Sequence, residues 1–172
     1  KRGGFKLIEV ASAGEVIFEH QEQRLKTHGV TDLVLNTPVQ SNNSEERIRI
    51  ALETPLRLKH DNKLHATLSF EVLIRACLRR IALLNNNFGT GEPALDYRGL
   101  VERAKRIQMA SSTIRWFDWK RYSNRQEQSM LMGGMIGEAT YQGRLAEFLP
   151  LIRYCEKVHL GKATTFGLGK IK

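Results

Sequence analysis

The last fourteen residues, HLGKATTFGLGKIK, gather three glycines, three lysines and two threonines around a single phenylalanine. Lys-bearing, glycine-rich loops are typical of phosphate binding, because small residues let backbone N–H groups approach a phosphate closely. The stretch fits neither nucleotide fingerprint. Ile171 stands where a Walker A loop needs Ser or Thr, and the chain ends where a dinucleotide-binding motif needs a helix. The sequence therefore predicts either a loop for another kind of phosphate or a tight turn that only the fold requires.

The charge of the chain favours a polyanionic partner. Among 172 residues, 27 are Lys or Arg and 18 are Asp or Glu, which gives a net charge of +9. Such an excess is the electrostatic footprint of nucleic-acid binding, although many basic proteins bind no nucleic acid. No stretch approaches the roughly 18 apolar residues that predict a membrane span. We therefore expect nucleic acid, and no membrane, as the partner.

Neither the cysteines nor the carboxylates form a pattern typical of a metal site. Cys77 and Cys155 each stand alone within an apolar helical pattern, so we expect buried thiols and a reducing, cytoplasmic location. Asp118 and Glu138 are isolated, whereas a two-metal nuclease needs several acidic ligands close together. The sequence predicts no metal and no cofactor.

One long helix is predicted over residues 69–84. Its apolar residues recur at spacings of three and four: Phe70, Leu73, Ile74, Cys77, Ile81 and Leu84. Ser69 is a suitable N-cap. Arg75, Arg79 and Arg80 fall on the other side of the helix, where they form either a solvated face or a basic face for RNA phosphates.

The remaining patterns predict a sheet. Alternating residues favour strands over residues 47–59, 111–123 and 129–143, and a short strand at the C-terminus. We expect Pro55 to end the first strand. In the third strand, a Gly-Gly pair at positions 133 and 134 predicts a bulge or a close backbone contact.

Two further helices complete the pattern. A short polar helix near residues 97–107 is interpreted as an insertion, and an apolar pattern predicts a helix over residues 145–155. Pro150 would break that helix in its middle, so we expect it in the first turn or at a kink.

From residue 46 to residue 172 the predicted order is β-α-β-β-α-β, an α+β, ferredoxin-like fold with a four-stranded antiparallel sheet and both helices on one face. The other sheet face would stay open, and in this fold it is a frequent RNA platform. Residues 1–45 form an N-terminal extension with a predicted hairpin of strands at 5–10 and 15–19. We interpret the extension as a remnant of, or a linker to, an upstream domain.

Three segments together resemble a known family: WFDWKRYSNRQ at 116–126, GGMIGEATYQGRLAEFLPLI at 133–152 and VHLGKATTFGLGKI at 158–171. They are similar to the C-terminal domain of the CRISPR-associated RAMP-superfamily endoribonucleases that process precursor CRISPR RNA. TPLRLK at 54–59 also fits, so the resemblance covers residues 47–172. It implies CRISPR-repeat RNA as the partner, an effector complex as the destination of the product, and metal-independent cleavage that leaves 2′,3′-cyclic phosphate and 5′-hydroxyl ends.

The resemblance also implies which residues contact RNA. In the C-terminal loop, backbone amides, charges and hydroxyl groups could meet phosphate or 2′-hydroxyl oxygens, and the residues are Gly161, Lys162, Thr164, Thr165, Gly167, Gly169 and Lys170. In the KRYSNRQ segment the candidates are Arg121, Tyr122, Ser123 and Arg125, and a charged, protected strand edge is the alternative for them. We interpret Phe166 as a packing residue of the loop.

Metal-free RNA cleavage needs a base for the 2′-hydroxyl proton and an acid for the leaving oxygen. His159, two residues before Gly161, is the candidate base because its ordinary pKa suits proton transfer near neutrality. The alternative is that His159 only orders the loop through a backbone hydrogen bond. Tyr122 is the second catalytic candidate, through its hydroxyl group, and His65 is a weaker one.

Several relatives carry two ferredoxin-like domains and hold the general base in the N-terminal one, whereas this chain has room for one complete copy. The base could therefore lie outside these residues. Two other functions stay open: a RAMP subunit that holds RNA without cutting it, and a ferredoxin-like domain whose basic surface binds an acidic protein.

Overall fold

The computed structural model describes residues 4–12, 14–26, 35, 45–60, 63–64, 66–123 and 127–172. The chain separates into two compact units, Lys1–Val34 and Leu35–Lys172, which are described one at a time. No helix among the described residues is long and apolar enough to span a membrane.

The first unit is a small antiparallel sheet. Strand β1 (Glu9–Ser12) pairs with β2 (Glu15–Glu19), which pairs with the short β3 (Arg24–Leu25). Gly14 has a φ of +85° in the turn between β1 and β2, a conformation that glycine adopts without strain. The predicted hairpin is confirmed, although its first strand begins at Glu9 rather than at residue 5.

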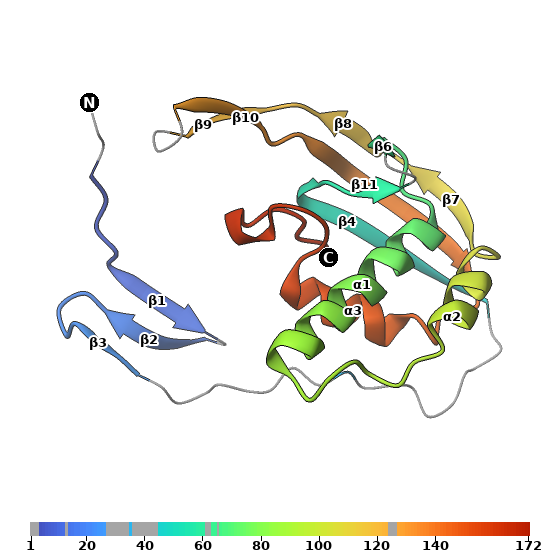
Figure 1. The fold of residues 1–172 in the computed structure, drawn as a ribbon, viewed down its shortest axis with the longest axis horizontal. Helices are drawn as coiled ribbons and strands as arrows, with labels where there is room; N and C mark the ends of the chain where they lie inside the picture. The colour runs from blue at the N-terminus through green and yellow to red at the C-terminus, as the bar shows by residue number, and fades with distance from the viewer. Residues whose placement is uncertain are drawn as a thin grey trace. The chain divides into compact units, whose positions relative to one another are not determined.

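The second unit is built on an antiparallel sheet whose central strand is β11 (Gly134–Gly143), drawn in orange in Figure 1. One edge of β11 pairs with β4 (Glu46–Leu56) and the other with β7 (Gln108–Ser112) and β8 (Arg115–Phe117). Beyond β4, the C-terminal segment pairs through a bridge between Leu52 and Ile171. The resulting order, C-terminus–β4–β11–β7/β8, is the ferredoxin-like order, so the predicted fold is confirmed.

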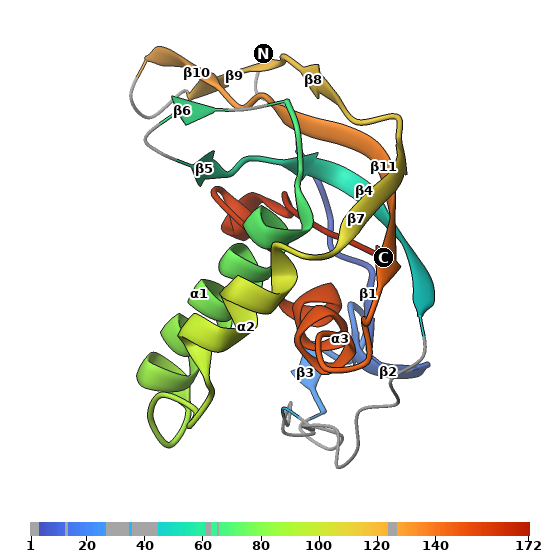
Figure 2. The same ribbon diagram turned by 90° about the vertical axis from the view of Figure 1, so that its right-hand side faces the viewer.

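Helices α1 (Phe70–Phe88), α2 (Tyr97–Ala104) and α3 (Leu149–Val158) all lie on the same side of this sheet (Figure 2). The alternation in β4 explains this arrangement, because Ile50 and Leu52 are buried and every second side chain of a strand points to the same face. The apolar face of α1 packs on the same core and contacts α3.

The ends of the helices follow their sequence signals. The Ser69 side chain accepts a hydrogen bond from the backbone N–H of Val72, 3.4 Å away, as the N-cap prediction requires. Helix α1 continues past the predicted end at residue 84 as far as Phe88, and the side chains of Asn85 and Asn87 in this extension donate to the carbonyl oxygens of Ile81 and Leu83. Helix α3 begins at Leu149 rather than at residue 145, with Pro150 in its first turn, where the missing N–H costs no helical hydrogen bond.

Two predicted strands are each split. The expected strand at 111–123 consists of β7, β8 and β9 (Lys120–Ser123), and β7 already begins at Gln108. The expected strand at 129–143 is divided into β10 (Gln128–Leu131) and β11, and β9 and β10 form a separate hairpin.

Glycine and proline positions account for these differences. Gly137 has a φ of +109°, and a Cβ there would lie 2.6 Å from the carbonyl oxygen of Thr113, so a local irregularity separates β7 from β8. A Cβ on Gly134 would lie 2.9 Å from the backbone of Leu56, which confirms the predicted close contact. Strand β4 continues through Pro55 to Leu56 because the register of β4 and β11 shifts there, and proline is tolerated at such a bulge.

The core contains an aromatic cluster and two free thiols. Phe70 contacts Tyr141 and Phe148 edge to face, with ring centroids 5.0 and 5.1 Å apart. Cys77 and Cys155 are buried and free, as predicted. Hydrogen bonding between the two thiols and burial together raise the pKa of Cys77, so this thiol stays protonated and unreactive.

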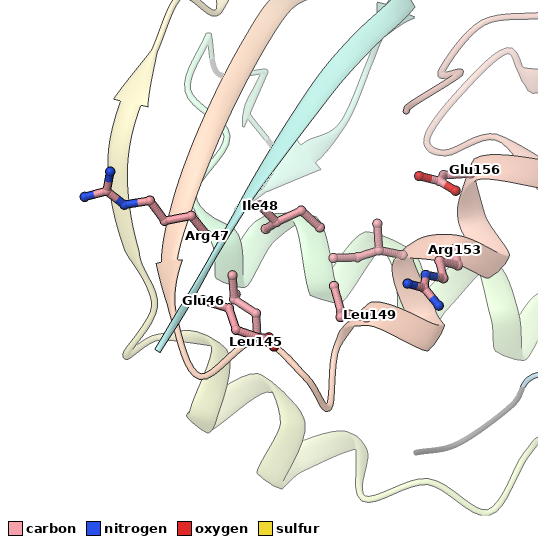
Figure 3. A pocket seen from close by; sticks show the side chains of 8 residues that line it. Glu46, Arg47, Ile48, Leu145, Leu149, Arg153 and Glu156 are labelled. Carbon is pink, nitrogen blue, oxygen red and sulfur yellow. The ribbon is translucent and has the colours of Figure 1, made fainter. Parts of the chain in front are cut away.

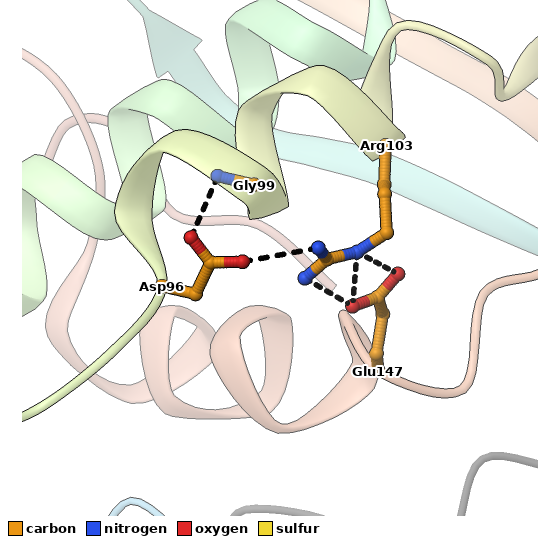
Figure 4. A network of polar contacts seen from close by, with 4 residues as sticks. All are labelled: Asp96, Gly99, Arg103 and Glu147. Carbon is orange, nitrogen blue, oxygen red and sulfur yellow. Dashed lines mark hydrogen bonds and ion pairs between the residues drawn. The ribbon is translucent and has the colours of Figure 1, made fainter.

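A polar network joins α2 to the segment before α3 (Figure 4). Asp96 accepts a hydrogen bond from the backbone N–H of Gly99 at 2.9 Å, and its other oxygen pairs with Arg103 at 3.1 Å. Arg103 also binds Glu147 at 2.9 Å. The hydrogen bond from Gly99 and the one from Arg103 lower the pKa of Asp96. The helix predicted as an insertion is thereby fixed to the core.

Replacing Arg103 should make unfolding less dependent on pH. Because the folded-state pKa of Asp96 is lowered, its contribution to stability is present above its ordinary pKa and is lost as the pH falls through the lowered value. Arg103→Gln should lower the melting temperature at pH 7 by about 2–4 °C. The difference from the unaltered chain should shrink below about pH 4. Circular dichroism melts from pH 3 to 7 measure this, and Arg106→Gln is the control.

Tyr141 supplies a second test of the core. Its hydroxyl group donates a hydrogen bond to the carbonyl oxygen of Leu68, its side chain is fully buried, and burial raises its pKa. Tyr141→Phe leaves that carbonyl unpaired, so the free energy of unfolding should fall by about 1–2 kcal/mol in urea titration. Tyr122→Phe, at a side chain that is 59% exposed, should change it by less than about 0.5 kcal/mol. Equal stability of Tyr141→Phe and the unaltered chain would contradict the assignment.

Candidate nucleic-acid interface

A hollow of about 430 Å³ lies between α1, the chain that follows β4, and the C-terminal loop. We call it the basic groove, and its charged lining residues are Arg57, Lys59, Arg75, Arg79, Arg80 and Lys162. Apolar side chains and Gly161 complete the lining, and no acidic side chain is among the residues that form it. Six cationic groups around one hollow favour the binding of an anion there.

The three predicted arginines of α1 meet in this groove but differ in their contacts. Arg75 pairs with Glu71 at 2.8 Å. Arg80 donates two hydrogen bonds, at 3.1 and 2.8 Å, to the carbonyl oxygen of Val158 and so holds the last turn of α3. Arg79 is exposed, and no carboxylate of the described residues lies within ion-pair distance of it. Arg79 is therefore the α1 arginine best placed to meet a ligand.

Sequence reasoning left Arg57 and Lys59 out of the candidate site. Both lie in TPLRLK, the segment that also contributed to the family resemblance. The guanidinium group of Arg57 donates a hydrogen bond from Nη1 to the carbonyl oxygen of Leu131 at 2.7 Å. In the sequence, these two residues could be noticed only as a basic pair directly after a strand. The tertiary structure places them opposite α1.

The glycines of the C-terminal loop have a clear structural role. Gly161 and Gly169 have φ values of +77° and +76°, and a Cβ would collide with the backbone oxygen of Arg57 at the first and of Leu160 at the second. Gly167 has a φ of +78° and open space around it. Of the two interpretations of the loop, the tight turn that the fold requires therefore explains Gly161 and Gly169.

Many backbone amides of this loop are already used within the protein. Lys162 N–H donates to Arg57 at 3.0 Å, and Gly169 N–H donates to Pro55 at 3.1 Å. The N–H of Lys170 donates to the Thr54 hydroxyl at 2.8 Å. The loop is consequently a rigid wall of the basic groove, and its side chains are freer than these amides to contact a ligand.

The loop also contacts the β9–β10 hairpin. The guanidinium carbon of Arg121 lies 4.4 Å from the centroid of the Phe166 ring, a cation–π contact. Phe166 is 50% exposed, so its ring packs against Arg121 at the surface and not in the core. Thr165 is exposed beside it and Thr164 is half-buried.

The other predicted residues of that hairpin are distributed along its first strand. Tyr122 follows Arg121 on β9 and is exposed, and Ser123 ends the strand. Arg125 and His65 lie outside the described residues.

Lys170 is the one predicted loop cation with a carboxylate partner among the described residues. Its ammonium group lies 2.8 Å from Glu53, and this hydrogen bond lowers the pKa of the Glu53 carboxyl group. The pairing balances the charge of Lys170, so Lys162 is the loop lysine that adds net charge to the basic groove.

His159 is half-buried at the C-terminal end of α3 with a φ of +58°. Its Nδ1 lies 3.1 Å from the carbonyl oxygen of Leu168. A carbonyl oxygen can only accept, so Nδ1 carries the proton and Nε2 keeps a lone pair that can accept one. The contact is the loop-ordering hydrogen bond of the alternative interpretation, and it leaves the imidazole chemically able to act as a base.

The open face of the sheet is less suited to an anion than the basic groove. Arg49 lies 3.6 Å from Glu138, and Arg47 donates to the side chain of Gln142 at 2.9 Å. These two arginines of β4 therefore already have partners on the neighbouring strand. The sheet face stays a predicted platform, and the basic groove beside the helices is a second candidate surface.

A larger hollow of about 570 Å³ lies between the start of β4 and α3 (Figure 3). Apolar side chains line it, among them Ile48 and Leu149, together with two acidic and two basic residues: Glu46, Arg47, Arg153 and Glu156. Balanced charge distinguishes it from the basic groove. No group of three His, Cys, Asp or Glu side chains in the described ranges is arranged to hold a metal ion.

A model of the CRISPR-associated endoribonuclease Cas6 family matches residues 50–171. The chain belongs to the Cas6 family. The resemblance noted in the sequence is thereby confirmed. No curated protein sequence matches the chain.

Solved Cas6 structures share the fold of this chain. A Cas6 product complex is 16% identical, with a TM-score of 0.53, over 73% of this chain and 50% of that one. A Thermus thermophilus Cas6 is 12% identical, with a TM-score of 0.52, over 78% of this chain and 54% of that one. In a partial Cas6-RT-Cas1–Cas2 complex the match is 17% identical, with a TM-score of 0.53, over 73% of this chain and 22% of that one. The chain spans about half the length of the first two structures.

Two glycines of the loop allow a matched test of its packing. Gly167→Ala imposes only the cost of a left-handed conformation on alanine, about 1 kcal/mol. Gly169→Ala adds the collision with Leu160 and should lower the free energy of unfolding by about 2–4 kcal/mol. Chemical denaturation measures both, and equal losses would show that the close approach at Gly169 is unimportant.

Proposed function

We propose that this Cas6-family chain binds CRISPR-repeat RNA in the basic groove, and that the protein to which it belongs cuts precursor CRISPR RNA without a metal ion. The single observation that supports RNA binding best is the groove itself, with six cations and no acid in its lining. The proposal includes a cytoplasmic location, where precursor CRISPR RNA would be met, and delivery of the product to a CRISPR effector complex.

The walls of the groove suit a single RNA strand. Arg57 and Lys59 come from one wall, Arg79 from α1, and Lys162 from the C-terminal loop. Cations on facing walls can each neutralise a backbone phosphate, and the release of counterions then drives binding. The exposed Arg121 and Thr165 would extend this contact along the loop.

Cleavage in this proposal uses the ribose 2′-hydroxyl as the nucleophile. The base at Nε2 of His159 takes its proton, the oxygen attacks the adjacent phosphorus, and the bond to the 5′-oxygen breaks, which yields a 2′,3′-cyclic phosphate and a 5′-hydroxyl. The hydrogen bond to Leu168 fixes the required tautomer of His159. Tyr122 is proposed to act through its hydroxyl group on the leaving oxygen.

A second function is that the chain holds RNA without cutting it. Its support is that the chain spans about half the length of the Cas6 structures it matches, while the hydrogen bond of His159 serves the loop equally well. The general base would then belong to the remainder of the protein.

RNA binding is tested by charge removal. Arg79→Ala should weaken binding of a fluorescein-labelled repeat RNA by about 3–10-fold at 0.1 M salt, and should reduce the slope of log K against log [salt] by about 0.7. Arg49→Ala is the matched control, because Arg49 is exposed on the other face of the sheet and paired with Glu138. Fluorescence anisotropy measures both, and equal effects would show that RNA does not occupy the groove.

Cleavage is tested in EDTA with the same RNA. A single cut that leaves a cyclic phosphate, reduced at least about 100-fold by His159→Ala, is the outcome expected if the base lies in this chain. His159→Gln keeps a donor for Leu168 and separates loss of the base from loss of loop order. Tight, salt-dependent binding with no cut would establish the second function.

A further inference from the structure

A second hollow adjoins the basic groove on the other side of Arg57. It measures about 370 Å³ and is lined by Arg57, Ala66, Trp116, Asp118, Leu131 and Gly133. Arg57 lines both hollows, so a strand that lies in the groove can place one of its bases here. The proposed function does not use Trp116 and Asp118, although both belong to the WFDW motif.

The carboxylate of Asp118 is held in place by its neighbours. The indole Nε1–H of Trp116 donates to Oδ1 of Asp118 at 2.6 Å. A Cβ on Gly133 would lie 2.5 Å from this oxygen, so glycine is what lets the carboxylate sit there. A carboxylate has about four lone-pair sites, and the indole occupies one of them. An oriented acceptor at the wall of an exposed hollow is typical of a recognition site.

Arg57 faces the same hollow with the opposite chemistry. One of its five N–H groups donates to the carbonyl oxygen of Leu131, which fixes the guanidinium plane. Trp116 and Leu131 supply apolar walls. The hollow therefore combines a fixed acceptor, a fixed donor and flat apolar surface, which is the chemistry that proteins use to bind an unstacked RNA base.

We propose that this hollow binds the base of an unpaired guanosine of the RNA. The N1–H and the 2-amino group of guanine are adjacent donors that can meet both oxygens of one carboxylate, and O6 can accept from Arg57. Adenine and cytosine each offer a single amino group to such a carboxylate, and uracil a single N–H. The proposal rests on the proposed RNA binding and adds a base preference to it.

The test uses mononucleotides and the indole signals of the intact chain. The chain has two tryptophans, and the spectrum of Trp116→Phe identifies the Nε1–H resonance of Trp116. Titration with GMP should shift that resonance saturably. IMP, which lacks the 2-amino group, should bind about tenfold more weakly, and AMP should leave the resonance unmoved.

Asp118→Asn is the informative variant, because its side-chain oxygen can still accept from Trp116. It should remove the preference for GMP over IMP while the Trp116 resonance stays near its original position. The proposal would be overturned if the Trp116 resonance did not respond to about 10 mM GMP, or if it responded to GMP, IMP and AMP with about the same Kd.

Binding of repeat RNA separates this proposal from the proposed function. If Arg79→Ala weakens RNA binding but Asp118→Asn leaves both affinity and the effect of guanosine-to-inosine substitutions unchanged, the groove binds RNA and the guanine site is refuted. If Asp118→Asn abolishes the cost of one inosine substitution, the site is supported even where no RNA is cut.

Discussion

The structure depends on the close approach of the C-terminal loop to the backbone that precedes it. Gly169 lies against Leu160, where any side chain would collide, and its N–H donates to Pro55. From there the chain runs beside β4, and Lys172 and Ala51 exchange backbone hydrogen bonds of 2.8 and 3.0 Å. The close approach at Gly169 thus positions the loop and lets the last residues pair with the edge of β4.

The same contact creates one wall of the basic groove. Gly161 packs on the carbonyl oxygen of Arg57, and Lys162 donates its N–H to that oxygen. The loop therefore brings its own lysine beside Arg57 and opposite α1. Arg80 strengthens the assembly from the other side, since it ties α1 to the end of α3. The groove is in this sense preorganised: some of its cations hold the fold, and Arg79 is left for a ligand.

Charge distribution distinguishes the surfaces of this Cas6-family chain from one another. The hollow beside α3 has balanced charges and an apolar lining, and the sheet face has arginines that are paired across strands. The basic groove differs from both because acids are missing from its lining. An anionic strand binds more readily to cations that are not already paired with carboxylates, because no existing ion pair has to be replaced. Family membership and this distribution both support the proposed binding of RNA.

The sequence by itself determined the kinds of element, their order and the starts of α1 and α2. Periodicity found α1 and α3, Ser69 marked the start of α1, and the glycine-rich terminus indicated a special loop. Pro150 was expected either in the first turn of α3 or at a kink, and it lies in the first turn. Only the tertiary structure decided that β7 and β8 are separated opposite Gly137 and that Phe166 supports Arg121 at the surface. It also decided which cations share a groove. Local patterns report which face of an element is apolar, whereas neighbours across the chain depend on backbone contacts between distant segments, which no short pattern encodes.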